Sequence, residues 1–103
     1  MVFIYSTCRD IVQAKELGRK IIKAKVASCV NIWPMESIYQ EDGGAKEDTE
    51  AVLMVKTNEP KMAEIEDFLR KNHTYSTPFI GGVHIDRINQ EYREWASQVI
   101  KLL

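Results

Sequence analysis

The sequence of 103 residues predicts an α+β fold, and three patterns support this prediction. Stretches rich in β-branched and aromatic residues alternate with stretches in which apolar residues recur with the period of a helix. An acidic, glycine-rich turn signal at residues 41–44 separates two consecutive strand-like stretches. The order is therefore strand, helix, strand, strand, helix, strand, helix. It predicts a ferredoxin-like βαββαβ sandwich with an added C-terminal helix, as a single domain over residues 1–103.

The first two elements are predicted at residues 2–8 and just after Asp10. Residues 2–8 are short, apolar and β-branched, which is typical of a buried strand. Asp10 then occupies a helix N-cap position. The apolar stripe of this helix faces the sheet, and the opposite face is charged; the stripe consists of Ala14, Leu17, Gly18, Ile21 and Ile22.

A long hairpin is predicted next. Residues 26–33 are apolar, Pro34 interrupts them, and residues 37–39 resume the pattern, which indicates one bent or bulged strand. The strand that returns from the turn covers residues 50–57. Its alternation predicts two faces, one formed by Ala51, Leu53, Val55 and Thr57 and the other by Glu50, Val52, Met54 and Lys56.

The second half of the chain repeats the helix-and-strand pattern. Pro60 suits a first helical turn, and the helix that follows ends near Asn72 with an apolar stripe of Met62, Ile65, Phe68 and Leu69. Residues 79–85 form a predicted strand. Asn89 then caps a last helix, whose stripe consists of Tyr92, Trp95, Ala96, Val99, Ile100 and Leu103.

The predicted sheet has one face without helices. Two helices cover the other face, whereas the open face includes Val52, Met54 and Val30 or Cys29. An exposed apolar sheet face usually implies a partner. The sequence therefore predicts self-association.

Composition excludes several classes of function. The chain is 45% hydrophobic and 28% charged, and no apolar run approaches the roughly 20 residues that cross a bilayer. The 14 basic and 15 acidic residues are dispersed, which argues against nucleic-acid binding. The first residues lack the pattern of a signal peptide, and Cys8 and Cys29 do not form a disulfide framework. We expect a cytoplasmic protein with no membrane partner.

Six short motifs, in order and at matching spacing, resemble the CutA family of divalent-cation tolerance proteins over nearly the whole chain. They are Ala27-Ser28-Cys29-Val30-Asn31-Ile32, Ser37-Ile38-Tyr39, Glu50 with Leu53, Lys56-Thr57, His73-x-Tyr75-x-x-Pro78, and Tyr92 with Trp95. The resemblance implies a homotrimer that binds copper or other divalent ions in a response to metal ions, with no enzymatic reaction. It also leaves open an alternative, a trimeric small-ligand sensor like the PII signalling proteins, with sites at subunit clefts and no metal role.

His73 and Cys29 are the candidate metal ligands. An imidazole nitrogen suits copper or zinc, and a thiolate suits Cu(I). This chain departs from the family's His-Pro-Tyr-Glu at Thr74 and Ser76, and Ser6 and Asn72 stand where some bacterial members carry proposed copper ligands. His73 also suits a helix C-terminus, and Cys29 also suits a buried strand position; both structural interpretations are favoured.

Five further residues are candidates for an inter-subunit cleft. Glu50 and Lys56 share one face of a strand, so burial of that face requires a partner for each charge, either across subunits or in a polar ligand. Pairing across subunits is favoured. The aromatic candidates Tyr39, Tyr75 and Trp95 also suit core packing with a hydrogen-bonded tip.

Two other activities of similar folds fit less well. An acylphosphatase-like hydrolase needs a glycine-rich phosphate-binding loop after the first strand, and the chain has only Arg9 ahead of a helix N-terminus there. An RNA-binding domain of the RRM type displays aromatic residues on its central strands, and residues 50–56 contain none.

Overall fold

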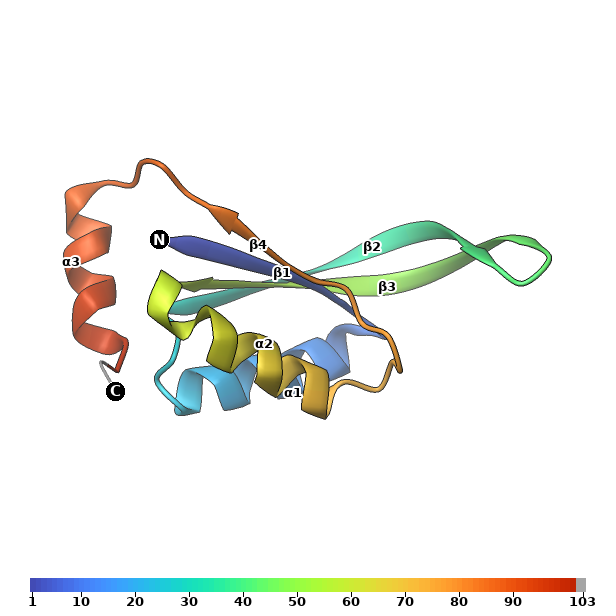
Figure 1. The fold of residues 1–103 in the computed structure, drawn as a ribbon, viewed down its shortest axis with the longest axis horizontal. Coiled ribbons are helices and arrows are strands. Elements are labelled where there is room, and N and C mark those ends of the chain that lie inside the picture. The colour runs from blue at the N-terminus through green and yellow to red at the C-terminus, as the bar shows by residue number, and fades with distance from the viewer. Residues whose placement is uncertain (102–103) are drawn as a thin grey trace.

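The computed structural model describes residues 1–101 and confirms the predicted order of elements. Strand β1 (Val2–Cys8) leads to helix α1 (Ile11–Lys23), the hairpin of β2 (Cys29–Glu41) and β3 (Gly44–Thr57), helix α2 (Met62–Asn72), strand β4 (Ile80–His84) and helix α3 (Gln90–Val99) (Figure 1). A short 3-10 helix at Glu59–Lys61, which contains Pro60, directly precedes α2. None of the helices in this part of the chain is long and apolar enough to cross a membrane.

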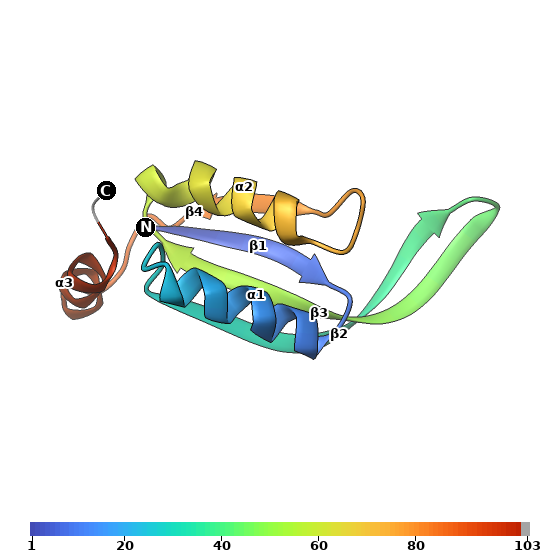
Figure 2. The ribbon, with the colours of Figure 1, turned by 90° about the horizontal axis from the view of Figure 1, so that it is seen from below.

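The four strands form one antiparallel sheet in the order β2-β3-β1-β4. Helices α1 and α2 lie side by side on one face of it (Figures 1 and 2). The core between these layers combines the inward residues of the central strands with the helix stripes; it includes Val2, Ile4, Leu17, Ile21, Leu53, Val55, Ile65 and Leu69. Asp10 caps α1 as predicted, because its carboxylate accepts a hydrogen bond from the backbone N–H of Gln13 at 2.8 Å.

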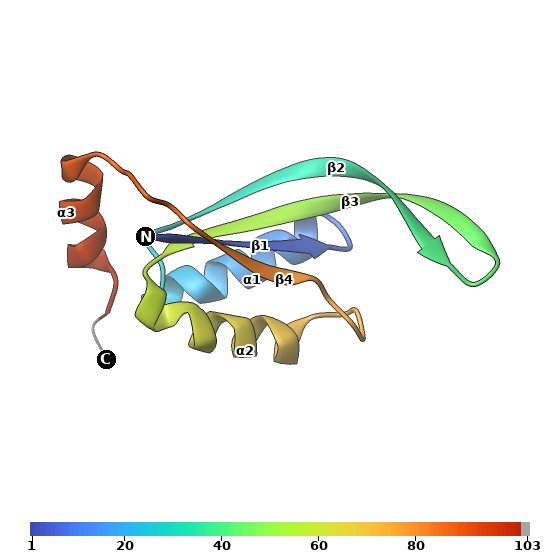
Figure 3. The ribbon, with the colours of Figure 1, turned by 45° about the horizontal axis from the view of Figure 1, so that its top comes forward.

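The hairpin extends beyond the rest of the sheet as a two-stranded arm, residues 36–49 (Figure 3). Nearly every residue of the arm is exposed, and the molecule measures 49 Å along its longest axis. Strand β3 therefore begins at Gly44 and not at residue 50, because Glu41 pairs with Gly44 directly across the Asp42-Gly43 turn. Strand β2 runs through Pro34 without a break, which an edge strand tolerates because its outer backbone groups have no partner.

The register decides between Val30 and Cys29, which the sequence left as alternatives for the open face. Cys29, Asn31 and Trp33 lie on this face, whereas Val30 packs toward the core and lies near Gly18 of α1. Val52 does belong to the open face but is buried within the single chain. Other large apolar side chains on or beside this face stay exposed, with Trp33 at 40%, Phe79 at 60% and Val83 at 56% of their full accessibility.

Several element ends also differ from the prediction. Strand β2 begins at Cys29 because residues 26–28 bend alongside the end of β3, where the Thr57 hydroxyl donates to the Val26 carbonyl at 2.6 Å. Strand β4 is shorter than residues 79–85. Asn89 precedes α3, but its side chain donates to Glu91 and caps no backbone group. Leu103, assigned to the last helical stripe, lies outside the described residues.

Candidate functional site

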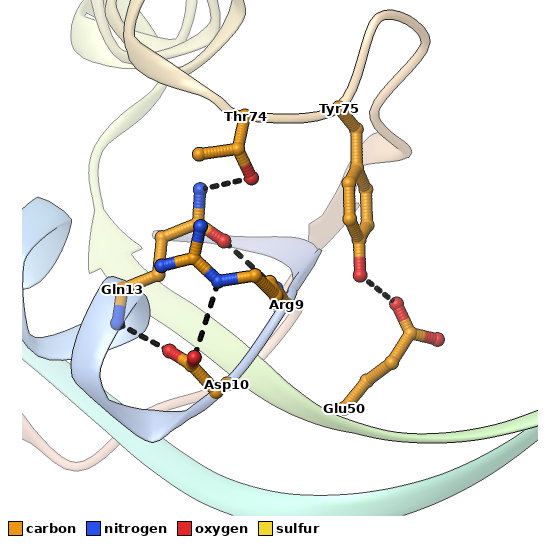
Figure 4. Close-up of polar contacts among 6 residues, drawn as sticks. All are labelled: Arg9, Asp10, Gln13, Glu50, Thr74 and Tyr75. Atoms are coloured by element: carbon orange, nitrogen blue, oxygen red, sulfur yellow. Dashed lines mark hydrogen bonds and ion pairs between the residues drawn. The ribbon is translucent and has the colours of Figure 1, made fainter.

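Glu50 and Tyr75 meet at one end of the sheet. Glu50 lies on β3, and Tyr75 lies in the segment that joins α2 to β4. The Tyr75 hydroxyl donates a hydrogen bond to the Glu50 carboxylate (Figure 4). Burial, followed by this hydrogen bond, raises the pKa of Tyr75 well above its ordinary value. The phenol therefore stays protonated and acts as a donor to the carboxylate.

His73 lies beside this pair, and both of its ring nitrogens contact the backbone. Nδ1 accepts a hydrogen bond from the Tyr75 N–H at 3.0 Å, so Nε2 carries the proton and donates to the Thr7 carbonyl at 2.7 Å. The imidazole also packs against the Tyr75 ring, with 4.7 Å between the centroids. A metal ion could bind His73 only after one of these two hydrogen bonds is released. Glu50, His73 and Tyr75 are called the Glu50 corner below.

A second set of polar contacts, which no local pattern in the sequence predicts, holds the Glu50 corner against α1. Gln13 donates to the Thr74 hydroxyl at 2.9 Å and accepts from the Arg9 N–H at 2.7 Å (Figure 4). Asp10 accepts from the Gln13 N–H and pairs with the Arg9 guanidinium at 3.1 Å. Hydrogen bonds from the backbone of Gln13 and the side chain of Arg9 lower the pKa of Asp10. The cap and the guanidinium that could have bound an anion at this helix end are thus paired with each other.

Ser6 and Cys8 lie on the helix-covered face of β1, and both are fully buried. The Ser6 hydroxyl donates to the Phe79 carbonyl at 2.8 Å. Burial, with smaller contributions from the Asp10 and Glu50 carboxylates, raises the pKa of the Cys8 thiol to about 11. Cys8 is therefore a neutral, enclosed thiol and a poor donor for an arriving metal ion.

Lys56 and Cys29 lie at the opposite end of the sheet, directly across from each other on β3 and β2. The Lys56 ammonium lies 5.7 Å from the ring centroids of both Phe3 and Tyr92. The Tyr92 hydroxyl contacts the Ser28 hydroxyl at 3.0 Å, which ties α3 to the start of β2. This set is called the Lys56 corner below and consists of Phe3, Ser28, Cys29, Lys56, Tyr92 and Trp95.

The structure brings some candidates together and separates others. It joins Glu50 with Tyr75, and it places Lys56 near the Tyr92–Trp95 pair, whose ring centroids are 5.4 Å apart. The two corners are separated by six residues of β3, or about 20 Å. His73 and Cys29 therefore do not meet within one chain, and residues 1–101 contain no group of three or more His, Cys, Asp or Glu side chains that could hold a metal ion.

Tyr39 belongs to neither corner. It lies on the arm, where its hydroxyl donates to Asp48 at 2.8 Å. This hydrogen bond raises the pKa of Tyr39, although both side chains face solvent. The cleft candidates are thus distributed over three separate places in one subunit.

This architecture defines a small α+β protein of the ferredoxin-like class, with an open sheet face and a polar corner at each end. The model of the family described as CutA1 divalent ion tolerance protein matches residues 2–99, so the chain belongs to that family. The family is one of tolerance proteins and not of enzymes.

Relatives from distant organisms agree with this assignment. The chain is 32% identical over 99 residues to the divalent-cation tolerance protein CutA of Archaeoglobus fulgidus, covering 96% of this chain and 97% of that one. It is also 32% identical to human protein CutA, over 92% of this chain but only 54% of the human one.

Solved structures share the fold. The periplasmic divalent cation tolerance protein CutA from A. fulgidus superimposes with a TM-score of 0.93 at 32% identity, covering 98% of this chain and 100% of that one. CutA1 from Oryza sativa gives a TM-score of 0.94 at 31% identity, covering 99% and 94%.

Proposed function

We propose that this chain forms a homotrimer in the cytoplasm, acts in tolerance of divalent cations, and binds copper or another divalent ion at its subunit boundaries. Membership of the CutA1 family supports the role in tolerance. Two free cysteines, with no disulfide in the described residues, suit a reducing compartment. The open sheet face supports the proposed assembly, and the environment of Cys29 supports the proposed metal binding.

The open sheet face is the observation that carries the assembly. Trp33, Phe79 and Val83 expose much of their apolar surface there, and Tyr5 and Met54 lie between them. Large contiguous apolar surfaces on soluble proteins mark interaction sites. A second and third copy of the chain would bury this face and bring the end of one sheet near the end of the next.

Of the two candidate metal donors, Cys29 has the fewer competing contacts. It is half-buried, and its thiol makes only a weak contact with the Val30 carbonyl at 3.6 Å. A thiolate suits Cu(I), and further donors from a neighbouring subunit, such as the Glu50 carboxylate or a released His73 imidazole, would complete a coordination shell. The geometry thus ranks Cys29 ahead of His73.

Titration with copper under anaerobic conditions tests this ranking. We expect Cu(I) to bind by calorimetry, Cys29→Ala to remove most of the binding, and His73→Ala to weaken it less. Cys8→Ala is the matched control, because that thiol is enclosed. Absence of Cu(I) and Cu(II) binding, or undiminished binding after both Cys29→Ala and His73→Ala, would contradict the proposal.

A second candidate function is a trimeric small-ligand sensor like the PII proteins, with no metal role. One observation favours it: the Lys56 ammonium lies between two aromatic rings and has no carboxylate partner in its own subunit, as far as residues 1–101 show. A cation held in this way is suited to an anionic ligand. Anion binding that persists in the absence of metal would support this function.

A further inference from the structure

The Lys56 ammonium has an unusual environment for a charged group. Lys56 is half-buried, and within residues 1–101 no carboxylate oxygen lies within 4.0 Å of its Nζ. Arg70, for comparison, is exposed and pairs with Glu66 at 2.8 Å. A partly desolvated charge without an opposite charge is costly, so the ammonium is poised to accept an anion.

The aromatic residues around Lys56 fix its position. The rings of Phe3 and Tyr92 lie at equal distances of 5.7 Å from the ammonium, within the range of a cation–π contact. The Ser28 hydroxyl donates to the Lys56 carbonyl at 3.2 Å, so the Tyr92 hydroxyl completes the 3.0 Å contact by donating to Ser28. This chain of hydrogen bonds holds the Tyr92 ring in place. The ammonium is therefore oriented before any ligand arrives.

Trp95 adds an apolar surface beside the charge. Its indole packs edge-on against the Tyr92 ring, with 5.4 Å between centroids, and 44% of the residue remains exposed. A cation next to an exposed aromatic surface recognises a ligand that has an anionic group and a flat apolar body. A bare inorganic anion would use only the charge.

We infer that the Lys56 corner binds a small oxyanion, a carboxylate or a phosphate, that carries a planar apolar body. The Lys56 ammonium donates hydrogen bonds to the oxyanion, and the Tyr92–Trp95 pair contacts the body. This inference rests on the second candidate function, because it names the class of ligand that such a sensor would take. It requires no metal ion.

The alternative occupant is a carboxylate from a second copy of the chain, such as Glu50. Within its own subunit Glu50 accepts one hydrogen bond, from Tyr75, and its second oxygen could still reach another subunit. A side-chain carboxylate alone would leave the Trp95 indole exposed, whereas a planar ligand covers both the charge and the ring. The structure therefore favours a ligand over an ion pair between subunits.

Fluorescence of Trp95 provides the test. The variant Trp33→Phe retains Trp95 as its single tryptophan, and it is titrated with sodium acetate, sodium benzoate and inorganic phosphate at constant ionic strength maintained with sodium chloride. We expect a saturable change, with benzoate binding about fivefold more tightly than acetate because its ring stacks on the aromatic pair. Adding Lys56→Gln should weaken benzoate binding about tenfold, whereas Lys56→Arg should retain it.

Lys46→Gln is the matched control, because Lys46 is an exposed cation on the arm that pairs with Glu41 at 3.2 Å. Equal responses with and without Lys56→Gln, or a response to sodium chloride alone, would overturn the inference. A second result would also overturn it: the parent binds no anion, and Lys56→Gln loses the assembly when its mass is measured by light scattering. Lys56 would then pair with a carboxylate of a second copy of the chain. The same samples are also titrated with copper. Copper binding without anion binding would contradict only this inference, and anion binding without copper binding would contradict only the metal proposal.

Discussion

At the scale of single residues, two tyrosine–carboxylate hydrogen bonds can be compared directly. Tyr75 donates to Glu50 in a partly buried corner, and Tyr39 donates to Asp48 on the exposed arm. The same chemical pair should contribute more where water competes less for the donor and the acceptor. We therefore expect the Tyr75–Glu50 hydrogen bond to stabilise the fold and the exposed Tyr39–Asp48 hydrogen bond to contribute little to stability.

Tyr75→Phe should lower the free energy of unfolding by about 1–2 kcal/mol, because the half-buried Glu50 carboxylate loses its phenol donor. Denaturant unfolding at one fixed chain concentration measures the change. Tyr39→Phe is the control and should leave the stability unchanged, since both of its partners face solvent. Equal effects of the two substitutions would show that Tyr75 and Glu50 gain nothing from their burial.

The raised pKa of the Cys8 thiol predicts that the folded chain loses stability at alkaline pH. Its pKa is about 11 in the folded chain, against 9.0 for an unperturbed thiol, so the unfolded chain loses this proton first. The stabilisation is therefore complete below pH 9 and is lost as pH rises toward 11. Tyr75, whose pKa is also raised, adds to the loss only above pH 10.

Unfolding measurements at pH 8, 9 and 10 should accordingly show a decline for the parent chain that Cys8→Ala makes shallower. The readout is the slope with pH, so a uniform loss of stability from the smaller side chain does not affect the test. Parallel slopes for the two proteins would mean that Cys8 is not enclosed in the folded state.

At the scale of elements, the sequence was most informative where local pattern and packing agree. The bounds of β1 and the Asp10 cap of α1 follow directly from residues next to each other in the chain. The sequence predicts a shorter hairpin than the structure has, because residues 44–49 are polar and carry no pattern of a half-buried strand. They pair with β2 only because the Asp42-Gly43 turn sets the register.

The candidate site was less predictable than the fold for a related reason. The spacing of Glu50 and Lys56 on one strand face was correct, but it could not show that the two charges lie at opposite corners with different neighbours. The contacts of His73 with Thr7 and Tyr75, and of Lys56 with Tyr92, depend on segments distant in the sequence. Such contacts arise from tertiary packing and leave no local pattern.

The turn of the arm contains two consecutive glycines with positive φ, and Gly44 has a φ of +145°. Gly43 has a φ of +90°, in the region that L side chains rarely adopt. Gly43→Ala should destabilise the hairpin by about 1 kcal/mol through backbone strain, measured by denaturant unfolding. Asp42→Ala, at the neighbouring turn position with no positive φ, is the control; an equal effect of both would exclude backbone strain as the cause.

At the scale of the whole molecule, the open face is the main apolar surface that a single subunit leaves exposed. Helices α1 and α2 cover one side of the sheet, helix α3 lies beyond one end of it, and the arm extends from the opposite end (Figures 2 and 3). If copies of the chain bury the open face, the Glu50 corner and the Lys56 corner of different subunits can lie near each other. Self-association is therefore required for the metal proposal.

A charge on the open face should disrupt the assembly. Trp33→Glu places a carboxylate among apolar residues and should shift the particle toward a monomer, because an unpaired charge is costly to bury at an interface. Val12→Glu is the matched control, since Val12 on α1 is 62% exposed but lies on the opposite side of the molecule from the open face. If both variants dissociate, or neither does, the open face is not the interface.

The molar mass of the unmodified protein at micromolar concentration tests the central claim most directly. Light scattering coupled to size-exclusion chromatography should give a single species of three times the 11.9 kDa subunit mass. A single species at the subunit mass would contradict the homotrimer and, with it, any binding site shared between subunits.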